Sequence, residues 1–246
     1  MKKIKNLILT FFRFFGISVT RYNPISDKKN QLIKVLDLLQ TDIIFDIGAN
    51  EGQFAYDLFN HGFNGKIVSF EPLTSARKKL EILAKKNSKW FVHEQCALGS
   101  KNGEIEINIS KNSVSSSVLP MEKIHLNAAP NSYYIGKEIV SIKKLDYIGA
   151  NYLTSNSNIF IKIDVQGYEL DVINGASEII KKTNGIICEL SLVPLYKNSH
   201  TWNIIVERLE KENFLIWALQ PAFSNKQTGQ NLALDVIFIK KNKIIF

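Results

Sequence analysis

The feature that most constrains this chain is the alternation of short apolar segments with longer amphipathic ones. Five segments rich in Ile, Val and Phe lie at residues 43–47, 66–70, 90–98, 159–165 and 185–191. Between most of them, apolar residues recur every three or four positions, which is the spacing of a helix that buries one face. Because strands that alternate with helices form a parallel sheet covered on both sides, we predict an α/β fold.

The predicted helices lie at residues 32–39, 52–61, 75–86, 169–182 and 201–212. Two more strand-like segments, 103–109 and 138–145, flank a loop rich in Ser, Asn and Pro at residues 110–137. This loop is long enough to act as a lid or substrate cap. The chain ends in two strand-like segments, 214–219 and 233–241, with no helix between them. Such a pair indicates a hairpin, so we expect one edge strand of the sheet to be antiparallel.

Charge divides the chain into a basic leader, residues 1–30, and a domain, residues 31–246. The formal net charge is +8, and seven basic residues lie in the leader against one acidic residue, Asp27. The domain is nearly neutral, and a nucleic-acid-binding protein would carry a basic patch there, so we expect no nucleic-acid partner. The two cysteines, Cys96 and Cys188, are too few for a disulfide framework. We therefore expect a cytoplasmic protein.

The leader combines lysines with a dense set of aliphatic and aromatic residues. It is not a typical signal peptide, because Arg13 interrupts the apolar region and no Ala-x-Ala-like site follows. Apolar residues occur nearly all round the predicted helix, and the basic ones cluster at its start. Two interpretations remain open here: the helix packs on its own domain or a second subunit, or it lies peripherally on the inner face of the membrane.

The end of the first strand is the first candidate for a ligand site, because open parallel sheets bind ligands at the carboxyl ends of their strands. Residues 46–52 read Asp-Ile-Gly-Ala-Asn-Glu-Gly, without the three-glycine pattern of NAD-binding loops. A carboxylate at Asp46 suits a cationic or zwitterionic ligand such as S-adenosylmethionine better than a pyrophosphate. The alternative is a structural turn with a glycine cap.

The next two strand ends offer further contacts to a nucleoside. Glu71 ends the second strand, where a carboxylate can accept hydrogen bonds from both ribose hydroxyls of either NAD or S-adenosylmethionine. Ala97, near the end of the third strand, is a weaker candidate for backbone contacts to adenine.

Two carboxylates, Asp164 and Glu189, close the fourth and fifth strands. They could hold Mg²⁺ together with water and substrate hydroxyls, bind the substrate directly, or pair with Lys162. We do not favour a metal, because the sequence identifies no third ligand. Glu169, in the first turn of the following helix, is either a helix N-terminal residue or a substrate contact.

Two histidines are candidates for a general base. His125 lies in the long loop and His200 follows the fifth strand, so each could overhang the strand ends. The alternative for both is an exposed loop histidine without a catalytic role.

Six segments in order, DIGANEGQF, SFEP, ALGS, KKLDYI, FIKIDVQGYELDVINGA and ICELS, resemble the FkbM family of S-adenosylmethionine-dependent methyltransferases. The resemblance spans residues 41–240 and implies a Rossmann-like class I methyltransferase fold, with seven strands, the last antiparallel, and helices on both faces. It also implies O-methylation of a sugar, glycan or similar small molecule. By position, it assigns Glu71 to the ribose, Asp164 to the sulfonium, and to the cofactor loop Asp46, Gly48, Asn50 and Gly52.

Two alternatives to a methyltransferase stay open on the sequence alone. A NAD-dependent oxidoreductase would also use a strand-end carboxylate such as Glu71. This sequence, however, lacks the three-glycine pattern of a NAD-binding loop. A membrane-tethered module could keep the cofactor pocket without catalysis.

Overall fold

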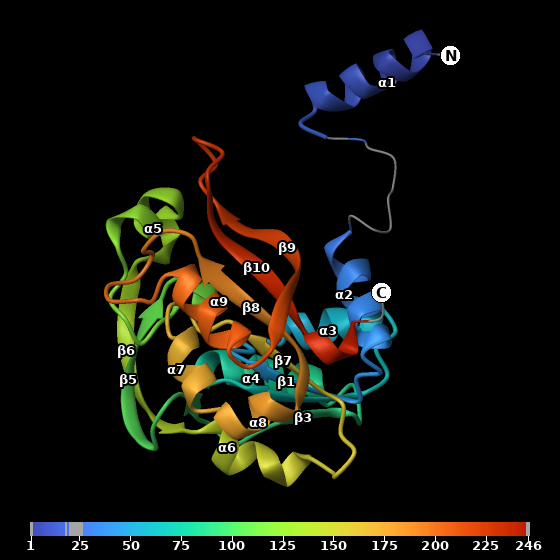
Figure 1. Ribbon diagram of the computed structural model, residues 1–246. Coiled ribbons are helices and arrows are strands. Elements are labelled where there is room, and N and C mark those ends of the chain that lie inside the picture. The colour runs from blue at the N-terminus through green and yellow to red at the C-terminus, as the bar shows by residue number, and fades with distance from the viewer. Residues whose placement is uncertain (1, 18, 20–26, 245–246) are drawn as a thin grey trace.

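A seven-stranded sheet forms the centre of the computed structural model, which describes residues 2–17, 19 and 27–244 (Figure 1). Its strands lie in the order β3-β2-β1-β7-β8-β10-β9. Their bounds are β1 Ile43–Ile47, β2 Lys66–Phe70, β3 Trp90–Val92, β7 Ile159–Ile163, β8 Thr183–Ser191, β9 Phe214–Ser224 and β10 Asn231–Lys240. The order reverses between β1 and β7, which is the position where such sheets bind ligands.

The predicted antiparallel last strand and the antiparallel pairing at one sheet edge are both confirmed. β10 runs antiparallel to both neighbours, β8 and β9, so β9 forms the edge. The reason is burial: residues 236–239 of β10 are all buried, whereas Trp217 and Leu219 of β9 are exposed. A strand that is apolar on both faces needs a neighbour on each side and cover on each face.

Helices cover both faces of the sheet, as predicted. The side chains of β1 alternate between the two faces, with Phe45 in one apolar cluster and Ile44 in the other. The Ile44 face is covered by α2 (Lys28–Leu38), α3 (Gln53–Asn60) and α4 (Thr74–Ala84). The Phe45 face is covered by α6 (Leu145–Ile148), α7 (Glu169–Asn174), α8 (Ser177–Lys182) and α9 (Trp202–Glu210).

The single helix predicted for residues 169–182 is wrong, because the chain breaks into α7 and α8 at Gly175. A Cβ at Gly175 would lie 1.9 Å from the carbonyl oxygen of Gly99, so the backbone passes too close for any side chain. The carboxylate of Asp146 then caps α8, accepting from the N–H groups of Glu178 and Ile179 at 2.9 to 3.0 Å. The break thus falls at a glycine that a distant segment approaches closely.

The single strand predicted for residues 90–98 is also wrong. β3 ends at Val92 because its partner β2 ends at Phe70, and the N–H of His93 makes the last bond to Ser69. Ala97–Leu98 instead forms β4 in a second sheet of order β4-β6-β5, with β5 at Gly103–Ser110 and β6 at Tyr134–Lys143.

The segment between β5 and β6 carries α5 (Lys123–Ala128) and short 3₁₀ helices at Ser113–Ser115 and Pro130–Ser132. Two more 3₁₀ helices occur at Gly149–Tyr152 and Lys241–Lys243.

The leader forms α1 (Lys2–Phe14), which stands apart from the sheet in Figure 1. Apolar residues were expected nearly all round this helix, but the helix is strongly amphipathic. Ile8, Phe11 and Phe15 recur at helical spacing on one side, and Arg13 lies on the other. Of the helices that the structure describes, none is long and apolar enough to cross a membrane.

Candidate functional site

A pocket of about 380 Å³ lies at the carboxyl ends of the central strands. Its walls come from the ends of β1, β2, β7, β8 and β10, and residues 113–118 of the long β5–β6 connection form another part. The polar and charged lining side chains are Asn50, Gln53, Glu71, Ser113, Ser116, Ser117, Lys162, Asp164, Gln166, Tyr168, Glu189 and Asp235. The pocket therefore brings together strand ends that the sequence indicated, one by one, as candidate ligand sites.

Gly48 makes the turn after β1 possible. Its φ of 74° lies in the left-handed region, and a Cβ there would lie 1.8 Å from the carbonyl oxygen of Asp164. Only glycine lets the β1 and β7 ends approach this closely. Gly52 has a φ of 94° at the start of α3, but its missing Cβ faces Leu80 and Trp90 and it does not line the pocket.

Glu71 lines the pocket with its carboxylate held from both sides. One oxygen accepts from the N–H of Asn50 at 2.8 Å and the other from the N–H of Leu73 at 2.9 Å. Burial raises the pKa of Glu71 to about 7, although these two donors and the charge of Lys162 oppose the shift. The remaining lone pairs of a fixed carboxylate are available to hydroxyl groups of a ligand.

Asp46 lies behind the pocket wall and not in it. It is fully buried, accepts from the hydroxyl of Ser69 at 2.8 Å, and lies 3.3 Å from Lys162 Nζ. Lys162 donates to the carbonyl oxygen of Gly48 at 2.7 Å. Burial lowers the pKa of Lys162, but Asp46 and Asp164 outweigh this and hold the pKa above its ordinary value. Asp46 thus acts on the turn through a charged lysine.

Asp164, Glu189 and Asp235 line the opposite wall of the pocket, and the first two are joined by Gln166. Its side-chain amide donates to Asp164 at 2.8 Å and to Glu189 at 2.6 Å. Asp235 on β10 stands directly opposite Glu189 on β8, so the two side chains point to the same face.

Two carboxylates on this wall, those of Glu189 and Asp235, have raised pKa values. Burial, followed by the charges of Asp164 and Asp235, raises the pKa of Glu189 well above its ordinary value. Burial and the charge of Asp164 raise the pKa of Asp235 to about 6. Groups that titrate near neutrality within a pocket are candidates for proton transfer.

Residues 113–118 bind to both walls of the pocket. Ser113 donates to the side-chain oxygen of Asn50 at 3.2 Å, and Ser117 donates to the carbonyl oxygen of Gln166 at 2.6 Å. The hydroxyl of Tyr196 lies 2.7 Å from the side-chain oxygen of Gln166 and 3.2 Å from the carbonyl oxygen of Ser115. This part of the predicted cap is thus tied to the site at several points.

Neither candidate histidine lines the pocket. His125 is buried between Tyr196 and Phe223, with ring centroids at 5.2 and 5.0 Å, and burial lowers its pKa to about 4. His200 is exposed. Glu169 stabilises the turn just before its helix, because its carboxylate accepts from the N–H of Gly167 at 2.9 Å.

Of the remaining predicted residues, Ala97 and Asp164 line the pocket. Within residues 2–17, 19 and 27–244, no group of three His, Cys, Asp or Glu side chains is arranged to hold a metal ion. Gln166 and Asp235 also line the pocket, and neither was predicted as a site residue. A signal was present for Asp235, which interrupts the apolar run of its strand between Leu234 and Val236.

Comparison with known proteins gives a family match. The sequence model of the methyltransferase FkbM domain matches residues 46–216, more than two thirds of the chain. No protein with a curated function matches.

Several solved methyltransferases resemble the chain at low identity. A methyltransferase FkbM from Methylobacillus flagellatus shares 15% identity over 80% of this chain and 43% of its own, with a TM-score of 0.48. A precorrin-6Y C5,15-methyltransferase from Geobacter metallireducens shares 15% identity over 91% and 94%, with a TM-score of 0.46. A magnesium protoporphyrin IX methyltransferase from Synechocystis shares 9% identity over 96% and 97%, with a TM-score of 0.46. The chain spans less than half of the length of the Methylobacillus protein.

Proposed function

The chain belongs to the FkbM family of methyltransferases, and on this premise we propose that it transfers a methyl group from S-adenosylmethionine to a hydroxyl of a sugar, glycan or similar small molecule. The family assignment favours a methyltransferase over a NAD-dependent oxidoreductase. The observation that carries the hydroxyl acceptor is the convergence of Asp164, Glu189 and Asp235 on one wall of the pocket.

The side of the pocket formed by Gly48, Asn50 and Glu71, called the cofactor side from here on, fits the nucleoside part of the cofactor. Glu71 has a carboxylate already oriented by two backbone donors, and its free lone pairs match a pair of ribose hydroxyls. Asp164 adjoins this side because its carbonyl oxygen packs against Gly48, and its carboxylate suits a positive charge and not a phosphate. When bound, S-adenosylmethionine supplies an electrophilic methyl group on a positively charged sulfur.

The opposite side, formed by Gln166, Glu189 and Asp235, is called the acceptor side. Carboxylates accept hydrogen bonds, so this wall selects a ligand that donates them, as the hydroxyls of a sugar do. Asp235 and Glu189 would orient one hydroxyl and take its proton while the new bond to the methyl carbon forms and the bond to sulfur breaks. A pKa of about 6 makes the carboxylate of Asp235 an effective base near neutral pH, and burial raises the pKa of Glu189 as well.

Residues 113–118 would exclude water and fix the acceptor. Their bonds to Asn50 on one side and Gln166 on the other hold them across the pocket. Holding the acceptor oxygen and the methyl carbon in line is the main task of the protein, because the displacement needs little other chemistry.

Calorimetry with S-adenosylmethionine and with NAD tests the cofactor. We expect saturable binding of S-adenosylmethionine and none of NAD. Incubation with methyl-labelled cofactor and a panel of sugars and glycans tests the acceptor, and mass spectrometry locates the added methyl group. A methyl group found on nitrogen or carbon would overturn the hydroxyl assignment, while binding without any turnover would favour a non-catalytic module.

A further inference from the structure

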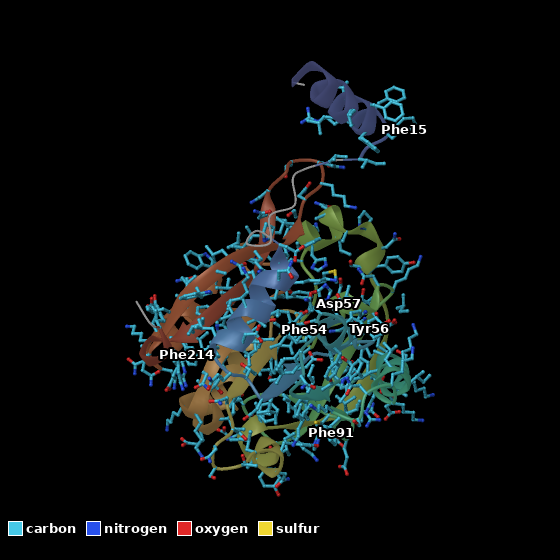
Figure 2. The ribbon with its side chains drawn as sticks, turned by 90° about the vertical axis from the view of Figure 1, so that its right-hand side faces the viewer. Phe15, Phe54, Tyr56, Asp57, Phe91 and Phe214 are labelled. Carbon is cyan, nitrogen blue, oxygen red and sulfur yellow. The ribbon has the colours of Figure 1, made fainter. Side chains whose placement is uncertain are left out.

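The aromatic side chains of α1 contact one another and leave their face open. Phe14 is 85% exposed, and Phe11 and Phe15 are each 61% exposed. The ring centroids of Phe11 and Phe15 lie 5.1 Å apart, and those of Phe14 and Phe15 lie 5.4 Å apart. Figure 2 shows Phe15 just after the end of α1, well clear of the rest of the fold. Exposed apolar faces of this kind mark interaction sites.

The charge of the same segment restricts the partner. Residues 1–26 contain five basic residues, Lys2, Lys3, Lys5, Arg13 and Arg21, and no acidic residue. A nucleic acid or an acidic protein surface would match the charge but not the phenylalanines. A second copy would match the phenylalanines but bring a second cluster of like charge. An anionic lipid surface matches both, because its headgroups attract cations and its acyl boundary accepts aromatic rings.

We propose that α1 docks this enzyme on an anionic lipid surface, with its phenylalanine face in the boundary between headgroups and acyl chains. Arg13 lies on the opposite side of the helix and faces the aqueous headgroup layer. The helix lies in the surface and does not cross it, in keeping with its 13 residues.

The leader joins the domain close to the pocket. α2 begins at Lys28, whose carbonyl oxygen accepts from the side chain of Gln220 at 3.4 Å and whose Nζ donates to Pro221. Gln220 pairs in register with Asp235, which lines the pocket. The start of α2 therefore lies at the same end of the strands as the pocket.

The length of chain between the helices limits how far the start of α2 can be from the lipid. Residues 15–27 separate α1 from α2, and thirteen residues span at most about 45 Å when fully extended. A docked α1 would thus keep the start of α2 within that distance of the lipid surface, whatever the acceptor is.

Co-sedimentation of the full-length protein with vesicles tests the proposal directly. We expect binding to phosphatidylglycerol vesicles that weakens as salt is added, and little binding to phosphatidylcholine vesicles. Replacing both Phe11→Ser and Phe15→Ser should weaken binding by about tenfold or more, since two exposed rings lose their apolar contact. Phe91→Ser removes an exposed ring from β3 and is the matched control, expected to bind as the unmodified protein does.

Three outcomes would overturn the proposal. One is the absence of sedimentation with phosphatidylglycerol at low salt, and another is an equal loss of binding in the Phe91→Ser control. The third is a change of oligomeric state in the Phe11→Ser and Phe15→Ser variant, measured by light scattering without lipid, while vesicle binding stays the same. That result would make α1 a contact between subunits. Circular dichroism of each variant checks that the domain is folded.

Discussion

On the cofactor side of the pocket, neighbouring residues hold the ligand-facing groups through their backbone, whereas on the acceptor side these groups come from segments far apart in the sequence. Gly48 and Asn50 belong to one turn, and Glu71 is fixed by two N–H groups. Gln166, Glu189 and Asp235 come from three different segments and meet only in the folded sheet.

This difference indicates a division of labour between affinity and chemistry. Backbone donors hold Glu71 in one orientation, which suits a cofactor that is the same in every methyl transfer. Side chains with raised pKa values on the acceptor side can be replaced without changing a backbone turn, which suits a substrate-specific wall. If this is correct, changes on one side should alter one parameter and leave the other almost unchanged.

The largest expected effect is on turnover, through Glu189→Gln. We expect kcat to fall by about 10² to 10⁴, the range for loss of a general base, while the Kd for S-adenosylmethionine changes little. Steady-state kinetics and calorimetry measure the two quantities. Glu104→Gln, which replaces an exposed carboxylate on β5, should leave both unchanged. A variant with normal kcat would remove Glu189 from the mechanism.

The second effect is on stability, through Gly48→Ala. The new Cβ would meet the Asp164 carbonyl in a backbone conformation that alanine disfavours, so unfolding should become easier by about 3 kcal/mol. Gly62→Ala is the matched control, because Gly62 also has a positive φ, 92°, but nothing lies within 4 Å of its Cβ. It should cost only about 1 kcal/mol in urea denaturation. Equal losses in the two variants would show that the close approach of β1 and β7 is unimportant.

The third effect is on cofactor affinity, through Glu71→Ala. Loss of a charged hydrogen-bond acceptor should weaken S-adenosylmethionine binding by about 1.5 to 3 kcal/mol. Glu51 lies in the turn after β1, but it pairs with Lys79 and does not line the pocket. Glu51→Ala should therefore bind S-adenosylmethionine normally in calorimetry. Unchanged affinity in Glu71→Ala, with the fold intact, would contradict the ribose assignment.

The fourth effect is a pH dependence of stability that the acceptor side contributes. Burial raises the pKa of Asp235 to about 6, so its folded pKa lies above its unfolded value. The folded state therefore binds the Asp235 proton more tightly than the unfolded state does. The stability that this proton contributes is present at low pH and is lost as pH rises through about 6. Asp235→Asn removes this titration and should raise stability at about pH 8 by about 1 to 2 kcal/mol relative to the unmodified protein. Urea denaturation below about pH 6 and at about pH 8 measures the difference in stability between the variant and the unmodified protein. Asp37→Asn, which changes an exposed carboxylate, is the control.

The smallest expected effect is that of chelation. Asp164 and Glu189 alone would supply only two ligands to a metal ion, and both already accept hydrogen bonds from Gln166. Activity should therefore persist in EDTA. Loss of activity on chelation and its recovery with Mg²⁺ would show that the acceptor side holds a metal after all.

Local patterns indicated some lining residues on each side of the pocket, Gly48 and Glu71 on one and Glu189 on the other, but not Asp235. Gly48 and Glu71 were identified because a turn and a strand end are encoded by consecutive residues, and both line the pocket. Asp235 was missed because its place beside Glu189 depends on which strand β10 joins, and no local periodicity specifies that. His125 looked like a loop histidine, but α5 buries it against Tyr196.

The sequence by itself determined the α/β alternation, the family and the cationic, aromatic leader, because each depends on residues near one another in the chain. Tertiary structure alone decided that β10 inserts between β8 and β9, that the chain breaks at Gly175, and that residues 113–118 lie across the pocket. Each of these features depends on a contact between distant segments: Asp235 with Glu189, Gly175 with Gly99, Ser117 with Gln166. Such contacts form only where packing brings two backbones together, so their free energy is absent from either segment alone.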